Sequence, residues 1–292
     1  MGNSGSKVDQ IPFQELEKPW RTFDWNQKNV LKERLERFVV SNKDVKDIKI
    51  LVTGQIGAGK SSFINSVISA FQGEIANEAL ADSTLGQSHS FTKKLTTYRI
   101  KRSETEYLPF VIIDINGLEP ETTTMAQITD TINCVRGHVK ENYEFRRDKQ
   151  LTPEDEENYK KDADISDQAF CLVYVMNTNS ARSTNDRLTE NLRLIRQAVS
   201  DEGIPQVIVM TKVDEACSLV KNDLRKIYTS SKIKQKIEEC SASVGVPISN
   251  IFPVKNYHFE TDTNYDADVL ILKVFDQIVR SANTRLRKGA FK

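Results

Sequence analysis

Short apolar runs with the length of buried strands alternate along the chain with longer stretches whose apolar residues recur at helical spacing. The runs lie at residues 48–52, 95–100, 110–114, 170–175, 206–210 and 251–254. Alternation of this kind favours a mainly parallel sheet with helices on both faces. The pattern therefore predicts an α/β fold in three layers, with a ligand at the carboxyl edge of the strands.

The stretches with helical spacing are defined by their apolar residues, and each predicts an amphipathic helix. These residues are Val30, Leu31, Leu35, Phe38 and Val39; Phe63, Ile64, Val67 and Ile68; Met125, Ile128, Ile132, Val135 and Val139; Leu188, Leu192, Ile195 and Val199; Leu224, Ile227, Ile233 and Ile237; and Val269, Leu272, Phe275, Val279 and Leu286.

The N-terminal part of the chain differs from the rest. Residues 1–45 contain a tail, an aromatic arm and the first helix, and we expect the main domain at residues 46–292. The arm carries Trp20, Phe23 and Trp25, which favour packing on that domain, with a partner-binding patch as the alternative.

A long segment at residues 118–168 separates two core strands and predicts an insertion or an enlarged mobile region. Its second half is charged and includes the Pro-Glu-Asp-Glu-Glu run at residues 153–157. Such a run is typical of a solvated face or a flexible loop. A regulatory or partner-contacting role is the alternative.

A glycine-rich sequence follows the first apolar run and opens a helical stretch. Residues 54–61 (Gly-Gln-Ile-Gly-Ala-Gly-Lys-Ser) match G-x-x-x-x-G-K-[ST] in the strand-loop-helix context that this motif requires. Backbone N–H groups of such a loop form an anion site, which the positive end of the following helix reinforces. We expect Lys60 to contact the β- and γ-phosphates of a nucleotide and Ser61 to ligate Mg²⁺. The other predicted phosphate-site residues are Gly54, Gly57, Ala58, Gly59 and Ser62.

Two further motifs follow later strands. Residues 114–117 (Asp-Ile-Asn-Gly) match D-x-x-G, in which Asp114 holds Mg²⁺ and the Gly117 N–H senses the γ-phosphate. Residues 211–214 (Thr-Lys-Val-Asp) match [NT]-K-x-D. A carboxylate at Asp214 accepts hydrogen bonds from the N1–H and 2-amino groups of guanine, and adenine offers no such pair of donors.

Together the motifs predict binding of GTP and GDP with Mg²⁺. Thr211, Lys212 and Asp214 are expected at the base, and so are Lys255 and Asn256 after the last strand.

Composition narrows the class of protein. Lys plus Arg and Asp plus Glu both number 41 among 292 residues, so the chain lacks the basic footprint of a nucleic-acid-binding protein. The four cysteines show no C-x-x-C and predict reduced core thiols of a cytosolic protein. The three histidines show no metal-ligand spacing, which leaves Mg²⁺ on a nucleotide as the expected metal. No run approaches the ~18 apolar residues of a membrane helix.

The first residues match M-G-x-x-x-[ST] with Gly2 and Ser6 in place, which predicts N-myristoylation; a flexible Gly/Ser tail is the alternative. A single acyl chain gives only weak, reversible membrane association. We therefore expect a cytoplasmic protein, partly membrane-associated if Gly2 is acylated. The basic residues from Arg280 to Lys292 either add to such binding or form a solvated helix end.

The motifs also carry a family resemblance. The chain resembles the translation-factor-related GTPase class and, within it, the interferon-induced protein 44-like family; immunity-associated and septin-like GTPases are more distant. The resemblance spans nearly the whole chain and implies a Ras-like P-loop G domain and a role in interferon-induced antiviral innate immunity. It rests on residues 18–21 (Lys-Pro-Trp-Arg), 24–25, 54–61, 114–118, 132–138 and 253–257.

Two residues depart from the small-GTPase pattern. Leu118 stands where those proteins commonly place a water-orienting Gln, and Ile56 stands where they have Gly near the γ-phosphate. Both departures predict slow hydrolysis unless a partner protein or a second copy of the chain supplies the missing groups. The candidate arginines for charge stabilisation are Arg99, Arg102, Arg136, Arg146 and Arg182.

The residue that completes the Mg²⁺ site lies in the polar stretch at residues 73–94. Its candidates are Thr84, Ser88, Ser90 and Thr92, and we favour Thr92 because it directly precedes a strand. Thr92 and Lys60 are the predicted catalytic residues, and Ser61, Thr92 and Asp114 form the predicted metal site.

Three functions remain open at this stage. The first is a GTPase with slow intrinsic hydrolysis, whose switch regions change shape between the GTP and GDP forms. The second is a GTP-binding interaction module with essentially no hydrolysis, in which bound nucleotide orders residues 73–94 and the segment after Gly117 for a partner or a second copy. The third is an ATP-dependent kinase or ATPase.

Overall fold

The sheet of this protein has six strands and is mixed. The computed structural model describes residues 14–79, 94–115, 117–119, 123–180 and 187–289. The strand order is β2-β3-β1-β4-β5-β6, with β2 antiparallel to β3 and every other pair parallel. The predicted mainly parallel sheet is therefore confirmed. The strands are β1 (Ile48–Gly54), β2 (Thr96–Lys101), β3 (Tyr107–Asp114), β4 (Cys171–Asn177), β5 (Gln206–Thr211) and β6 (Ile251–Pro253).

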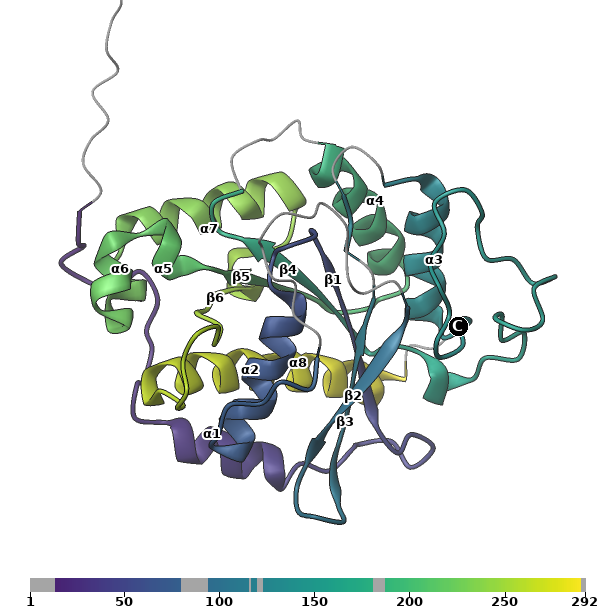
Figure 1. The fold of residues 1–292 in the computed structure, drawn as a ribbon, viewed down its shortest axis with the longest axis horizontal. Helices are drawn as coiled ribbons and strands as arrows, with labels where there is room; N and C mark the ends of the chain where they lie inside the picture. The colour runs from purple at the N-terminus through teal and green to yellow at the C-terminus, as the bar shows by residue number, and fades with distance from the viewer. Residues whose placement is uncertain (1–13, 80–93, 116, 120–122, 181–186, 290–292) are drawn as a thin grey trace, which may run out of the picture.

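Helices cover both faces of the sheet and complete the three predicted layers. Helices α1, α2 and α8 contribute to the apolar core on one face, and α3, α4 and α7 to the core on the other (Figure 1). The α-helices are α1 (Lys28–Glu36), α2 (Lys60–Gln72), α3 (Met125–Arg136), α4 (Arg187–Asp201), α5 (Val213–Ala216), α6 (Ser218–Asn222), α7 (Ser231–Val244) and α8 (Tyr265–Lys288); the 3₁₀ turns are η1 (Ile165–Asp167), η2 (Leu224–Tyr228) and η3 (Ile248–Asn250).

Both ends of helix α8 are stabilised by side chains. Asn264 caps it by accepting hydrogen bonds from the N–H groups of Asp266 and Ala267, and basic residues occupy its last turn. Arg285 near that end is buried and donates to the carbonyl oxygen of Ala169 (2.8 Å). At least this basic residue of the C-terminal end is therefore part of the packed structure.

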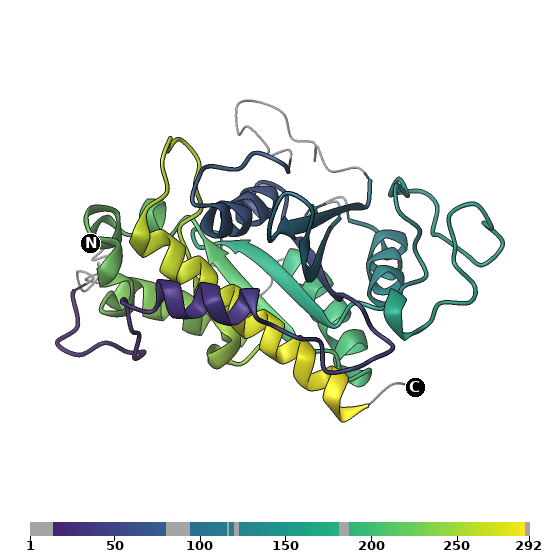
Figure 2. The same cartoon turned by 90° about the horizontal axis from the view of Figure 1, so that it is seen from below.

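Helix α1 lies alongside α8 and runs in the same direction (Figure 2). Lys28 forms an ion pair with Asp268 (2.6 Å), and further along both helices Arg34 pairs with Asp276 (3.2 Å). Leu31 and Leu35 are buried in the same core as α8, so α1 is part of the helical layer on that face of the sheet.

The aromatic arm packs on the molecule around Tyr228. Its rings lie 5.1 Å (Trp20), 4.9 Å (Phe23) and 6.4 Å (Trp25) from the ring of Tyr228. Arg21 donates to the carbonyl oxygens of Ile248 (2.6 Å) and Ile251 (2.8 Å), which attaches the arm to β6. These contacts support the packing interpretation of the aromatic residues over the partner-binding one.

Two predicted helices were wrong at their C-terminal ends. Helix α1 ends at Glu36; beyond it Phe38 packs on Phe110 (ring centroids 5.5 Å apart) and Val39 is 78% exposed. Helix α3 ends at Arg136 because Gly137 adopts a left-handed conformation (φ 82°), so Val139 lies outside the helix and bridges to Tyr159.

The predicted helix through residues 224–237 is two elements. Ser230 separates them: its hydroxyl accepts a hydrogen bond from the Ile233 N–H (3.2 Å) and thereby starts α7, while residues before it form η2.

The segment after α3 is held by one buried carboxylate. Asp130 is fully buried and accepts hydrogen bonds from the Tyr143 hydroxyl (2.8 Å) and the Leu151 N–H (2.9 Å). Residues 153, 154, 156 and 157 are exposed, which favours the predicted solvated face for the charged run. The run is therefore the outer side of a segment whose inner side is fixed to α3.

All four cysteines are buried and unpaired, as predicted. Burial raises the pKa of Cys171 and of Cys240 to about 12, so both thiols are unreactive. Within the described residues, no helix combines the length and apolar character needed to cross a bilayer.

Candidate nucleotide-binding site

The carboxyl ends of the parallel strands bring all three predicted motifs to one edge of the sheet. Strand β1 ends at Gly54, β3 at Asp114 and β5 at Thr211, and the pairing of Val52 with Asp114 places the first two ends side by side. The short strand β6 ends at Pro253, two residues before Lys255. Segments distant in sequence therefore form one site.

The phosphate loop requires its glycines for two different reasons. A Cβ on Gly54 would lie 2.1 Å from the carbonyl oxygen of Val175, so only glycine permits the close approach of β1 and β4. Gly57 (φ 70°) and Gly59 (φ 89°) adopt left-handed conformations, and Gly59 is the N-cap of α2. The helix therefore points its positive end at the loop.

Two side chains at the start of α2 face the phosphate side of the site. The Lys60 ammonium donates to the carbonyl oxygen of Gln55 (3.3 Å), and this lysine is only 6% exposed. The Ser61 hydroxyl donates to a carboxylate oxygen of Asp114 (3.1 Å), and both residues are buried. A hydroxyl and a carboxylate are the oxygen ligands that Mg²⁺ prefers, so these residues fit that ion.

The chain after D-x-x-G is paired with the phosphate loop. The Leu118 N–H donates to the carbonyl oxygen of Gly54 (2.9 Å), and the Ile56 N–H donates to that of Leu118 (3.2 Å). The Leu118 side chain is fully buried in the core. A Cβ on Gly117 would lie 2.6 Å from Ile56 Cγ1 and 2.7 Å from the Lys60 nitrogen, so this position accepts no side chain without displacing its neighbours.

The predicted base-binding segments are attached to the same loop. The Thr211 hydroxyl donates to the carbonyl oxygen of Ala58 (2.5 Å), and the Asn256 amide donates to that of Gly59 (3.1 Å). Lys212 adopts a left-handed conformation (φ 58°), which is uncommon for a residue with a side chain, and it starts α5. Asp214 lies in the first turn of that short helix.

These elements enclose a cavity of about 390 Å³. Its lining includes nine of the predicted site residues: Gly57, Gly59, Lys60, Ser61, Ser62, Lys212, Asp214, Lys255 and Asn256. Gly54, Ala58, Asp114, Gly117 and Thr211 do not line it. Gly54 and Ala58 belong to the phosphate loop, and the other three lie against that loop or the start of α2. Thr92, Thr84, Ser88 and Ser90 lie outside the described residues, so the third predicted metal ligand stays a prediction.

Six further residues line the cavity that no sequence motif indicated: Glu215, Lys221, Tyr257, His258, Phe259 and Glu260. Tyr257 belongs to the 253–257 stretch of the family resemblance, Glu215 directly follows Asp214, and His258, Phe259 and Glu260 follow the last strand; nothing in the sequence marked Lys221. Burial works to raise the pKa of Glu260, but hydrogen bonds from Lys255 and from the His258 N–H outweigh it and lower that pKa to about 2. Glu260 is therefore an ionised part of the cavity wall.

Three of the five candidate arginines are engaged elsewhere. Arg99 pairs with Asp47 (2.5 Å), Arg136 pairs with Glu202 (2.6 Å), and Arg102 donates to the carbonyl oxygen of Glu36. Within the part of the chain that the structure describes, no arginine lines the cavity. Arg182 lies outside that part.

A sequence model of the family described as 50S ribosome-binding GTPase matches residues 49–212, the span from β1 to the third motif. Among curated proteins, interferon-induced protein 44 of Mus musculus is 32% identical over 240 residues, which cover 82% of this chain and 56% of that protein. Interferon-induced protein 44-like of Homo sapiens is 28% identical over 82% of this chain and 52% of its own length. The chain thus spans little more than half the length of these relatives, and the predicted family resemblance is confirmed.

Among solved structures, Toc33 from Arabidopsis thaliana in complex with Mg²⁺ and GMPPNP has a similar fold, with a TM-score of 0.50. The match covers 89% of this chain and 97% of that chain at 16% sequence identity. This likeness concerns the fold alone and agrees with the three-layer α/β prediction.

Proposed function

The chain belongs to the 50S ribosome-binding GTPase family, and from this premise we propose that it binds GTP and GDP with Mg²⁺ in the cavity at the carboxyl edge of its sheet. The observation that carries the proposal is that Lys60, Ser61 and Asp214 line one cavity. Two of them match the phosphate motif and the third matches the base motif.

Selectivity for guanine comes from Asp214. Its carboxylate accepts the N1–H and 2-amino hydrogen bonds of guanine, and an unpaired buried donor or acceptor makes the wrong base unfavourable. Lys212 and Asn256 line the cavity beside it, and the bond from Asn256 to Gly59 supports a fixed distance between base and phosphates.

Mg²⁺ fits between α2 and β3, where Ser61 and Asp114 would hold it. When bound, the ion neutralises negative charge on the β- and γ-phosphates. The chain's own groups act around it: Lys60 binds phosphate oxygens, and the N–H groups at the start of α2 orient them. Thr92 is the proposed third residue of this site.

We expect intrinsic hydrolysis to be slow. Leu118 follows D-x-x-G, carries no polar group and is fully buried, so it cannot orient an attacking water. Ile56 contributes its bulk beside Gly117. A partner protein or a second copy of the chain that supplied an arginine would typically raise the rate by about 10³ to 10⁵.

The second candidate function is a GTP-binding interaction module with essentially no turnover. Leu118 favours it for the isolated chain, because its buried side chain cannot orient water. Its backbone bond to Gly54 still connects the segment after D-x-x-G to the phosphate loop, so nucleotide binding alone can move that segment. In this form the nucleotide state controls binding of a protein partner or a second copy through residues 73–94 and the segment after Gly117.

The biological setting is proposed from the relatives. Their names say that they are interferon-induced, which supports a role for this chain in interferon-induced antiviral innate immunity. A cytoplasmic location is proposed with this role. Interferon treatment of cells that express it should raise its abundance, and loss of the chain should raise viral titre. Unchanged abundance and titre would remove this part of the proposal.

Weak membrane association through myristoylated Gly2 is also proposed, and Gly2 lies outside the described residues. The intact mass of protein made in eukaryotic cells tests it, since an unmodified N-terminus would exclude the acyl group.

Calorimetric titration with GTP, GDP and ATP in the presence of Mg²⁺, followed by phosphate release at several protein concentrations, tests the biochemical proposal. Tight GTP binding with release that rises with protein concentration indicates a self-activating GTPase. Tight binding with negligible release at every concentration indicates the interaction module. Preference for ATP would instead favour a kinase or ATPase, and absence of any binding would contradict nucleotide binding altogether.

A further inference from the structure

Two aromatic residues, His258 and Phe259, line the cavity together with the predicted base-binding residues. Phe259 is 88% exposed, more than any other large apolar side chain in the described parts of the chain. It nevertheless lines the same cavity as Asp214 and Lys212. Its ring lies 3.9 Å from that of His258, centroid to centroid, at an angle of 52°.

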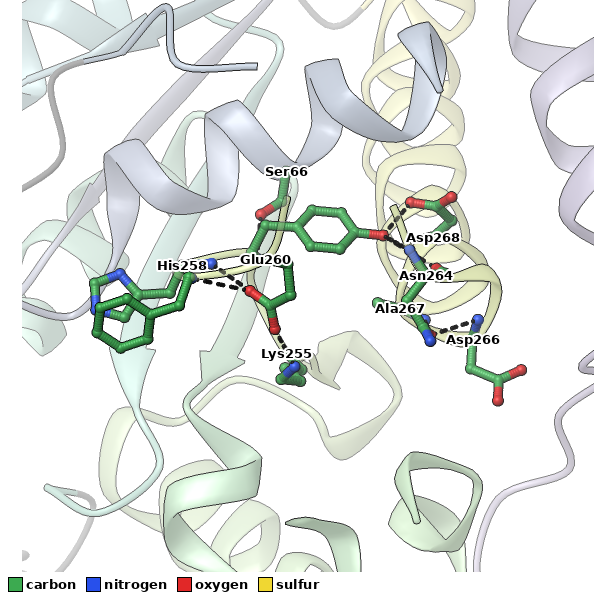
Figure 3. A network of polar contacts seen from close by, with 10 residues as sticks. Ser66, Lys255, His258, Glu260, Asn264, Asp266, Ala267 and Asp268 are labelled. Atoms are coloured by element: carbon green, nitrogen blue, oxygen red, sulfur yellow. Dashed lines mark hydrogen bonds and ion pairs between the residues drawn. The ribbon is translucent and has the colours of Figure 1, made fainter. Parts of the chain in front are cut away.

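The backbone that carries these rings is fixed by Glu260. One carboxylate oxygen of Glu260 accepts hydrogen bonds from the N–H groups of His258 (2.8 Å) and Phe259 (3.1 Å), and the other is paired with Lys255 (Figure 3). Because the ionised carboxylate accepts hydrogen bonds from two successive N–H groups, the loop backbone has a fixed conformation before a ligand binds.

Tyr257 fixes the other side of the same loop. Its N–H donates to the Ser66 hydroxyl of α2 (2.9 Å), and its own hydroxyl donates to Asp268 of α8 (2.6 Å). The Asn264 N–H donates back to the Tyr257 hydroxyl (2.7 Å). Figure 3 shows the His258 ring on the far side of the loop from these contacts. The loop is thus anchored to two helices while its aromatic residues project from it.

We propose that Phe259, supported by His258, stacks on the base of the bound guanine nucleotide. The inference rests on the proposed function. It gives a contact to the flat face of the base, for which the sequence motifs supply none. Asp214 is suited to the hydrogen-bonding edge of guanine and Lys60 to the phosphates, whereas the flat face of the base needs an apolar cover. Phe259 is the apolar one of the two exposed aromatic residues in the described cavity wall, and a base on its ring would remove apolar surface from water.

Stacking and edge recognition have different consequences. Because every base has a π face, stacking strengthens binding of any nucleotide without selecting among bases. We therefore expect Phe259 to contribute affinity and Asp214 to contribute guanine preference. Base selectivity would then come from the segment β5–α5, and base affinity from the loop after β6.

The first test compares Phe259→Ala with the wild-type protein in GDP and ADP titrations. Alanine should weaken both by the same factor, about 5- to 150-fold, the range for loss of one base–aromatic contact. Inorganic triphosphate, which has no base, should bind both proteins equally. Val39→Ala, which removes an exposed apolar side chain far from the cavity wall, is the matched control.

The second test is optical and does not depend on affinity. In Phe259→Trp, indole fluorescence should be quenched when GDP binds but not when inorganic triphosphate binds, while the wild-type protein with Trp20 and Trp25 gives the background signal. Wild-type GDP binding with no effect of Phe259→Ala and no quenching overturns the stacking alone. No GDP binding by the wild-type protein overturns the proposed function and the stacking together.

Discussion

The backbone N–H of Leu118 donates a hydrogen bond to the carbonyl oxygen of Gly54 at 2.9 Å, so the residue after D-x-x-G is paired with the first residue of the phosphate loop. Its side chain turns into the core. Any nucleotide-dependent movement of this segment must therefore break a backbone bond to the loop that holds the phosphates.

The first prediction concerns Leu118→Gln, which introduces the residue that small GTPases commonly have. We expect no gain in GTP hydrolysis, because position 118 is fully buried and its side chain packs in the core. A buried amide without partners should lower the free energy of unfolding by about 2–4 kcal/mol. Single-turnover phosphate release and urea unfolding measure both effects. Leu118→Met, expected to lose less than about 1.5 kcal/mol, is the control; a faster Gln variant would contradict the buried placement.

The second prediction concerns base selectivity. In Asp214→Asn the side chain still accepts from N1–H, but its amide now donates, which matches the 2-oxo group of xanthine and repels the 2-amino group of guanine. Preference should therefore move from GDP to xanthosine diphosphate by at least about 10²-fold. Competition binding measures the ratio. Glu215→Gln, which alters the neighbouring carboxylate in the same cavity, should leave the preference unchanged.

The third prediction concerns the metal. Removal of Mg²⁺ with a chelator should weaken GTP binding by the wild-type protein, because Ser61 and Asp114 then face the phosphates without the cation. Ser61→Ala should weaken Mg²⁺ binding by at least ~10-fold, the loss typical even of outer-sphere partners. GTP titrations over a Mg²⁺ series give the value. Ser62→Ala is the neighbouring control, and an equal response of the two alanine variants would argue against Ser61 as the ligand.

The fourth prediction concerns Gly117. In Gly117→Ala the new methyl group would lie 2.7 Å from the Lys60 nitrogen and 2.6 Å from Ile56 Cγ1. Lys60 can move away at its flexible end, so the fold should survive while phosphate binding weakens. Thermal unfolding and GDP titration separate these effects. Gly203→Ala, where a Cβ would meet nothing within 4 Å, should lose stability through its left-handed φ but bind GDP normally.

The fifth prediction concerns pH. Burial raises the pKa of Asp130 above its usual 3.8, and the hydrogen bonds from Leu151 and Tyr143 only partly oppose it. A carboxyl whose pKa is raised on folding stabilises the protein below its unfolded pKa, and this contribution is lost as pH rises through the folded value.

Asp130→Asn removes that titration, so its free energy of unfolding should improve relative to wild type as pH rises from about 4 to about 7. Urea unfolding at each pH, with exposed Asp148→Asn as control, measures the difference. A constant difference across the range would show that Asp130 ionises normally.

The phosphate loop could be predicted from sequence because its chemistry is local. Gly54, Gly57 and Gly59 are required by close approach or by left-handed φ, and Lys60 and Ser61 follow at fixed spacing. Strand order then brought the other motifs to the same edge, since the carboxyl ends of parallel strands meet there.

The aromatic loop could not be predicted in this way. The positions of His258 and Phe259 depend on a contact of Glu260 with Lys255 in the same loop and on contacts of Tyr257 with α2 and α8, and no periodicity marks such contacts. Asp130 was missed for a related reason: a carboxylate within a helical stretch is typical of a solvated face, and only its bonds to Tyr143 and Leu151 make it a core residue.

The short strand β6 has a consequence for biosynthesis. The phosphate loop ends at Ser61, but Asn256, which bonds to Gly59, emerges from the ribosome much later. At about 5–20 residues per second this interval is roughly 10 to 40 s. During that time the nascent chain presents a glycine-rich loop that no base-binding segment has closed. Under the proposed function, nucleotide binding favours chains in which β6 has docked and Asn256 bonds to Gly59, so it stabilises the assembled site over the open one.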